Sequence, residues 1–402
     1  MTSRRVLAVL AIAELLAMAP WFSASAVAPT LSRVWQLSPV TTAWLTISVQ
    51  LGFVAGALVS AILTLADRLS ARRLVAGSAA LAALATLGVA AARGITAGIA
   101  CRLLTGAALA GVYPPGMKIA AGWFKEGRGL AIGILVGALT LGSASPHLVR
   151  WVVAPAAWRV VLVVAAASAI AGGLLVLLVP SDGPFAAPSP PFSLAAAPRI
   201  LRDRAVALAN LGYLGHMWEL YAMWTWIAAF VAASEHARRG VAADVGGVAA
   251  LVTFGVVGSG AIGCWLGGKY ADRWGRTIVT SVAMAISGGC CLLAGFVFGA
   301  PLVALLPLLL AWGVSIVADS AQFSAAVSEL APTEYVGTAL TLQTSMGFLL
   351  TCATIYLLPR AAGAIGWRWS MSVLALGPAL GIVAMLALRR RPEARLLAGG
   401  AG

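Results

Sequence analysis

The segment Glu14-Leu-Leu-Ala-Met-Ala-Pro-Trp21 recurs 205 positions further along the chain as Glu219-Leu-Tyr-Ala-Met-Trp-Thr-Trp226. Five of the eight residues are identical, and Glu, Met and Trp coincide by chance much less often than Ala or Leu in a chain of this composition. Asp67-Arg68 and Asp272-Arg273 are related by the same offset. Self-similarity at a fixed offset is typical of a duplicated structural unit. The chain is therefore predicted to consist of two related halves.

Each half is predicted to be a bundle of membrane-spanning helices. Of the 402 residues, 61% are apolar and 10% are charged, whereas a soluble domain carries about 25% charged residues. The mean hydropathy is +0.96. The apolar residues form runs of about 20 residues, the length that crosses a bilayer as a helix. We count twelve such runs: residues 6–28, 41–65, 74–92, 94–117, 129–149, 160–179, 205–234, 245–268, 277–301, 302–328, 335–358 and 369–388.

The basic residues predict how these helices are oriented. If the amino terminus is cytoplasmic, 18 of the 27 Lys and Arg, Lys125 among them, lie in cytoplasmic segments, and eight lie in external segments. Cytoplasmic loops of membrane proteins carry an excess of Lys and Arg. Both termini are therefore predicted to lie in the cytoplasm, with the chain in a bacterial cytoplasmic (inner) membrane. The formal charge of +14 is then a topology signal, and no nucleic-acid partner is expected.

A polar segment divides the helices into six and six. It extends from residue 180 to residue 204 and contains six prolines, which prevent regular structure. We predict an N-terminal bundle over residues 1–180, a cytoplasmic linker over 181–204 and a C-terminal bundle over 205–402. All five cysteines fall inside predicted spans, so neither a disulfide nor a metal site is expected, and no cofactor is indicated.

Three motifs carry a resemblance to a known family. The segment Gly268-Lys-Tyr-Ala-Asp272-Arg273-Trp-Gly275-Arg276 is similar to the G-x-x-x-D-R-x-G-R signature of the major facilitator superfamily. A degraded copy follows the second span, Asp67-Arg68-Leu-Ser70-Ala-Arg72-Arg73, and Arg102-Leu-Leu-Thr-Gly106 resembles the family's intramembrane arginine motif.

The resemblance implies a fold and a gate. The implied fold is an all-α membrane protein of twelve transmembrane helices in two pseudo-symmetric six-helix bundles, which alternate access to a central cavity. In that family the Asp-Arg loops latch the cytoplasmic helix ends. The residues implied for this cytoplasmic gate are Asp67, Arg68, Asp272, Arg273 and Arg276.

Ionisable residues at membrane depth are candidates for function because placing them there costs ~3 kcal/mol or more. Residues three or four positions apart lie on the same face of a helix. Met, Trp and Gln residues at this spacing from an ionisable residue are therefore added to the candidates. Stripes of Met and Trp at this spacing also occur where helices merely pack. The residues expected to line a cavity between the first, fourth, seventh and tenth spans are Glu14, Met18, Trp21, Arg102, His216, Glu219, Met223, Trp226, Asp319 and Gln322.

Roles are assigned to five of these residues. Glu219, assisted by Glu14, is predicted to carry a coupling proton, with His216 three residues away as a relay or as a structural donor. Asp319 is a third acid that could instead cap or latch the cytoplasmic helix end. Arg102 is expected to pair with one of the acids rather than to bind an anionic group of the solute.

The sequence as a whole predicts a proton-coupled secondary transporter of a small organic solute, acting as a monomer in the bilayer. Symport is slightly favoured, because the fifth span contains Gly129, Gly133, Gly137 and Gly142 but lacks the Gly-Pro pair of the family's antiporter motif. Drug or metabolite efflux by proton antiport is the alternative. No convergent nucleophile, base or metal set is present, so an enzyme is not expected.

Overall fold

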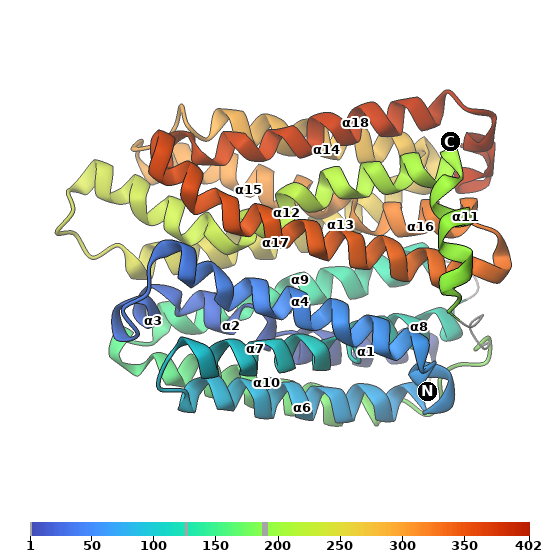
Figure 1. The fold of residues 1–402 in the computed structure, drawn as a ribbon, viewed down its shortest axis with the longest axis horizontal. Coiled ribbons are helices and arrows are strands. Elements are labelled where there is room, and N and C mark those ends of the chain that lie inside the picture. The colour runs from blue at the N-terminus through green and yellow to red at the C-terminus, as the bar shows by residue number, and fades with distance from the viewer. Residues whose placement is uncertain (1, 125–127, 187–191) are drawn as a thin grey trace.

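Long helices run side by side along the longest axis of the molecule (Figure 1). This computed structural model describes residues 2–124, 128–186 and 192–402, so Lys125 and residues 187–191 of the predicted linker lie outside it. The first half contains α1 (Ser3–Ala17), α2 (Pro20–Ala26), α3 (Ala28–Val34), α4 (Pro39–Ile62), α5 (Leu65–Arg68), α6 (Ala71–Ala91), α7 (Ile95–Leu109), α8 (Tyr113–Trp123), α9 (Arg128–Val152) and α10 (Trp158–Val176). The second half follows α11 (Ala197–Arg202) and contains α12 (Arg204–Arg239), α13 (Gly246–Trp274), α14 (Arg276–Leu293), α15 (Leu302–Ala318), α16 (Ser320–Leu330), α17 (Val336–Ser370) and α18 (Leu376–Arg389).

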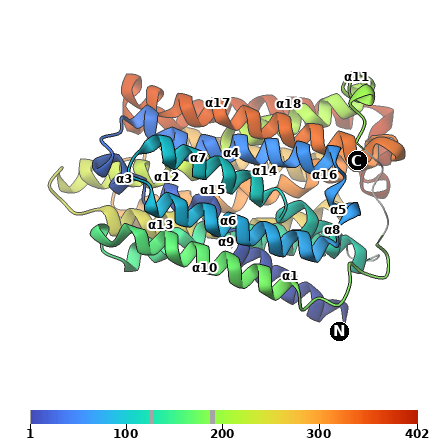
Figure 2. The same ribbon diagram turned by 60° about the horizontal axis from the view of Figure 1, so that its bottom comes forward.

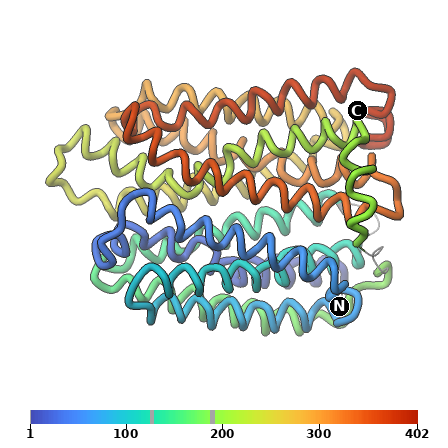
Figure 3. Tube along the Cα trace, in the orientation of Figure 1, coloured from blue at the N-terminus to red at the C-terminus, as the bar shows by residue number. Residues whose placement is uncertain are grey.

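The two halves form two layers, and both chain ends lie at the same end of the molecule (Figures 1 and 3). The termini share one end because each half crosses the length of the molecule an even number of times. This arrangement is the pair of helical bundles that the duplicated sequence predicts.

Ten segments of the described chain are long and apolar enough to cross a membrane. The last of them, Thr333–Arg389, contains two helices, α17 and α18. The 36-residue α12 is not among the ten, because its Trp, Tyr, His and Glu residues lower its hydropathy, yet it is long enough to span. Together these helices account for the twelve predicted spans.

Three of the predicted spans are interrupted within the membrane. The first is divided into α1 and α2 at Pro20, because proline lacks an N–H and its ring clashes with the carbonyl of the preceding turn. The fourth is divided into α7 and α8 just before Pro114 and Pro115. The tenth is divided into α15 and α16 at Asp319. Interrupted helices in transporters lie where the backbone borders a binding cavity.

Several helix ends differ from the sequence prediction. Helix α14 ends at Leu293 rather than at residue 301, and α18 begins at Leu376 rather than at residue 369. Helix α13 extends to Trp274, so Asp272 and Arg273 lie in its last turn rather than in a loop. It ends there because Gly275 has φ +87°, a conformation that favours glycine. Helix α17 continues beyond the predicted end at residue 358 to Ser370, with a kink at Gly366.

Most of the contact between the two halves in the described chain is made by two pairs of helices. Helix α9 packs against α13, and α4 packs against α17 (Figure 2). The α9–α13 contact is close because Gly133 and Gly137 face it: a Cβ added to them would lie 3.1 Å from the Cys264 carbonyl oxygen and 3.4 Å from that of Ala261. Gly133 and Gly137 therefore serve helix packing between the halves, whereas Gly142 packs against Leu15 of α1 in the same half.

Candidate functional site

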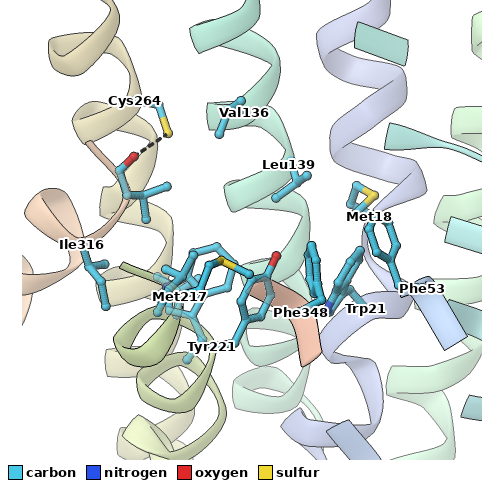
Figure 4. Packing of buried hydrophobic residues seen from close by; sticks show 14 of the residues in the cluster. Met18, Trp21, Phe53, Val136, Leu139, Met217, Tyr221, Cys264, Ile316 and Phe348 are labelled. Carbon is cyan, nitrogen blue, oxygen red and sulfur yellow. Dashed lines mark hydrogen bonds between the residues drawn. The ribbon is translucent and has the colours of Figure 1, made fainter. Parts of the chain in front are cut away.

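An aromatic cluster fills the middle of the interface between the halves (Figure 4). Trp21 and Phe53 come from α2 and α4, and Tyr221 and Phe348 come from α12 and α17. Ring centroids lie 4.9 Å apart for Trp21–Phe53, 4.6 Å for Phe53–Phe348 and 5.1 Å for Tyr221–Phe348. All four side chains are buried. The rings therefore close the space between the halves at this point.

The sequence indicates only part of this cluster. Trp21 belongs to the predicted cavity set, and Tyr221 lies within the repeated segment. Phe53 and Phe348 are single aromatic residues in ordinary apolar helices, and no signal in the sequence distinguishes them from packing residues.

Glu219 lies inside the second half, where three side chains donate to its carboxylate. Trp312 Nε1 on α15 donates to Oε1 over 2.5 Å, and Cys291 Sγ on α14 donates to the same oxygen over 3.2 Å. Ser287 Oγ on α14 donates to Oε2 over 2.8 Å. The carboxylate therefore links α12 to two neighbouring helices. Ser287 and Cys291 are four residues apart on one helix face, a spacing that could have suggested them as partners.

His216 pairs with Asp319 rather than with Glu219. His216 Nδ1 lies 2.9 Å from Asp319 Oδ1, and both side chains are 1% exposed. The contact is at ion-pair distance without the alignment of a hydrogen bond, and His216 Nε2 has no hydrogen-bond partner within the described residues. His216 and Glu219 lie one turn apart on the same face of α12. Helix α15 contributes a partner to each of them: Trp312 to Glu219, and Asp319, at the end of α15, to His216.

Arg102 corrects another expectation, because it binds backbone carbonyls and not an acid. Its Nε donates to the Leu45 carbonyl over 2.9 Å and its Nη1 to the Pro20 carbonyl over 2.7 Å. Its Nη2 donates to the Trp21 carbonyl. The side chain is fully buried. It fastens α7 to α4 and to the start of α2, next to the interruption at Pro20.

Glu14 has different surroundings from Glu219, although the repeat relates them. Its side chain is 4% exposed, and Oε1 has no hydrogen-bond partner in the described part of the chain. Its Oε2 lies against Gly116 of α8, only 2.7 Å from where a Cβ would be. The duplication preserves the residue and its burial, but not its contacts.

The remaining cavity candidates are also buried. Met18 and Met223 are both inaccessible to solvent. Trp226 faces α17, where its Nε1 donates to the Ile355 carbonyl over 3.0 Å. Gln322 lies with the gate residues, since its Oε1 accepts a hydrogen bond of 2.7 Å from Arg276 Nη1.

The second gate loop is organised around Arg276. This residue binds both carboxylate oxygens of Glu329, over 2.7 and 2.6 Å, and lies 3.7 Å from Asp272. Asp272 is exposed and faces the first turn of α9, because its Oδ2 would lie 3.7 Å from a Cβ on Gly129. A carboxylate near a helix N-terminus is stabilised by the helix dipole. Asp272 thus connects α13 with α9 of the other half.

The first gate loop has its own ion pair. Lys118 Nζ binds the Asp67 carboxylate and donates to the Ala66 carbonyl over 2.9 Å. Arg68 and Arg273 are both exposed. No group of three or more His, Cys, Asp or Glu in the described ranges could hold a metal ion.

The fold and these buried charges define a multi-pass membrane transporter. The Major Facilitator Superfamily profile matches residues 10–355, and the chain belongs to this superfamily. It is therefore a transporter of small-molecule solutes and not an enzyme. A search of curated proteins gives no significant match.

Solved structures of three transporters share the fold at low sequence identity. The nucleoside transporter NupG is 15% identical with a TM-score of 0.73, covering 95% of this chain and 99% of that one. A D-xylose-proton symporter is 16% identical with a TM-score of 0.74, covering 97% and 98%. A bacterial homologue of the human lysosomal transporter Spinster, inward-facing and unoccupied, is 15% identical with a TM-score of 0.74, covering 97% and 99%.

Proposed function

We propose that this transporter moves a small organic solute together with protons, as a monomer in the bacterial cytoplasmic membrane with both termini inside. The bundles over residues 1–180 and 205–402 rock about their interface, with 181–204 as the linker. The observation that carries the proposal is Glu219, a buried carboxylate held by donors from two neighbouring helices. A structural relative is described as a proton symporter, which supports the same direction of coupling.

Protonation of Glu219 has a direct structural consequence. Hydrogen bonds to an ionised carboxylate are roughly twice as strong as those to a neutral group. Adding the proton therefore weakens the attachment of α12 to α14 and α15. Tyr221 lies two residues further along α12 and contacts Phe348 and Trp21 of the aromatic cluster. Because Tyr221 moves with α12, a displacement of this helix changes the ring contacts at the interface between the halves.

A proton biases the conformation only if its binding favours one state over the other. The charged form of Glu219 favours the state described here, in which its three donors are in place. The neutral form favours a state in which α12 is displaced and the rings part. His216 and Asp319, one turn away on the same side of the bundle, are the second proton site in this proposal.

The interface rings favour one class of solute. Trp and Tyr faces bind flat apolar molecules and cations. We propose a small solute with a flat or cationic part, such as a nucleoside, a class named in one structural relative. Efflux of a drug or metabolite by proton antiport is the second candidate, and the same rings and buried acids favour it.

The experiment uses the purified protein in proteoliposomes. A thermal-shift screen of nucleosides, pentoses and aromatic amines first identifies a solute, and its accumulation is then measured under imposed pH gradients. Glu219→Gln, which mimics the protonated acid, should abolish proton-driven accumulation and retain solute exchange. Glu235→Gln is the matched control, because Glu235 is also a buried acid of α12 but lies near the carboxyl end of the helix, paired with Arg238 and Arg239.

Each outcome has a distinct meaning. Uptake driven by an acidic exterior indicates symport, and uptake driven by an acidic interior indicates antiport. If Glu219→Gln accumulates solute with unchanged pH dependence, the proton does not bind at Glu219, and Asp319→Asn becomes the decisive variant.

A further inference from the structure

A groove of about 370 Å³ runs along the outer side of α6, beside α5. Arg68 of α5 lines one end of the groove, and α5 lies at the end of the molecule that holds both termini (Figure 2). Leu81 in its wall is 40% exposed although α6 is a membrane-spanning helix, so this side of α6 faces lipid. The lining residues on which the proposal rests are Arg68, Ser70, Arg73, Leu74, Gly77 and Leu81.

The mouth of the groove carries uncompensated positive charge. Arg68 and Arg73 are exposed, and neither forms an ion pair or hydrogen bond with another residue in the part of the chain that the structure describes. Two nearby acids have other cationic partners: Lys118 binds Asp67, which precedes Arg68, and Arg72, which precedes Arg73, lies 3.6 Å from Asp182. Two arginines therefore face the groove without an anion.

A shielded polar atom lies between these arginines in the sequence. The Ser70 hydroxyl oxygen is buried and has no hydrogen-bond partner within the described residues. It does not cap the helix that begins after it. Buried hydroxyl groups are usually hydrogen-bonded, so a donor or acceptor from outside the protein fits this position.

The groove changes character along its length. Beyond the arginines, its wall is formed by Leu74, Gly77 and Leu81. From Ser70 to Leu81 the helix rises about 16 Å at 1.5 Å per residue. A free phosphate would use only the mouth, whereas an amphiphile with an anionic head and an apolar chain fills the whole groove.

We propose that this groove binds an anionic phospholipid. Its phosphodiester lies between Arg68 and Arg73 within reach of Ser70, and an acyl chain lies along Leu74 and Leu81. Anionic lipids of the cytoplasmic leaflet are attracted by juxtamembrane basic residues, by about five-fold in binding constant for each Lys or Arg. The two arginines together should favour such a lipid over a zwitterionic one by about 25-fold.

Native mass spectrometry of the purified protein tests this proposal with phosphatidylglycerol, phosphatidylcholine and inorganic phosphate as probes. Arg73→Gln should lower phosphatidylglycerol occupancy about five-fold, and the double variant with Arg68→Gln should bind it no better than phosphatidylcholine. Arg5→Gln is the matched control, because Arg5 is also exposed at this end of the molecule but does not line the groove.

A second variant tests the acyl chain separately. Gly77→Leu adds a side chain to the wall of the groove, where a Cβ would have no atom within 4 Å apart from its own helix backbone and chain neighbours. It should reduce phosphatidylglycerol binding while both arginines remain. Unchanged occupancy in the double arginine variant or in Gly77→Leu would overturn the proposal. Displacement of the lipid by millimolar inorganic phosphate would assign the mouth to free anions instead.

Discussion

Replacing Arg102 tests whether its partners are backbone carbonyls, as observed, or an acid, as the sequence suggested. Three hydrogen bonds from a charged group contribute roughly 1.5–3 kcal/mol each. The cost of placing an arginine at the membrane centre, about 2.5–3.5 kcal/mol, opposes them. Arg102→Met removes both contributions, so it should lower the free energy of unfolding by roughly 1–6.5 kcal/mol.

Arg102→Lys separates the two possibilities. Lysine keeps the charge and its insertion cost, but one ammonium group cannot reach the Leu45, Pro20 and Trp21 carbonyls that the planar guanidinium binds together. It should therefore be no more stable than Arg102→Met. If the partner of Arg102 were an acid, Arg102→Lys would retain most of the stability of the unaltered protein.

A thiol-reactive dye measures this effect in detergent, because Cys264, Cys290 and Cys291 are buried and become reactive on unfolding. We expect Arg102→Met to lower Tm by roughly 1–8 °C, because the entropy of unfolding scales with the length of the chain. Arg93→Met is the control, since Arg93 is exposed at the turn before α7. A near-native Tm for Arg102→Lys would refute the carbonyl-binding explanation.

Three further predictions follow from the gate, the aromatic cluster and the topology. Asp272→Asn removes the charge that faces α9, so transport should fall while solute affinity in a binding assay is retained; equal loss of both would argue against a gate. Phe348→Ala should lower the free energy of unfolding by about 3–5 kcal/mol in the thiol assay, because it leaves a cavity among buried rings, and an unchanged Tm would contradict that packing. A reporter fused after Gly402 should register as cytoplasmic and one inserted within residues 240–245 as external, where α12 has ended; the reverse pattern would overturn the orientation.

Much of the fold could be predicted because its signals are local. The length of an apolar run reports a membrane span, and the repeat of Glu14–Trp21 at Glu219–Trp226 reports the duplication, whatever the helices later contact. Helix continuity was less predictable. Pro20 interrupts the first span, whereas α17 continues through Pro359, so the surroundings decide whether a proline ends a helix.

The candidate site also has features that the sequence predicts and features that it does not. The sequence by itself determined that Glu14, Arg102, His216, Glu219 and Asp319 are buried at membrane depth, because a charged residue inside an apolar run has no other place. Only the tertiary structure decided their partners: Asp319 for His216, backbone carbonyls for Arg102, and Ser287, Cys291 and Trp312 for Glu219. The physical reason is that helical periodicity fixes the direction in which a side chain points, whereas the packing of the bundle determines which neighbouring helix lies in that direction.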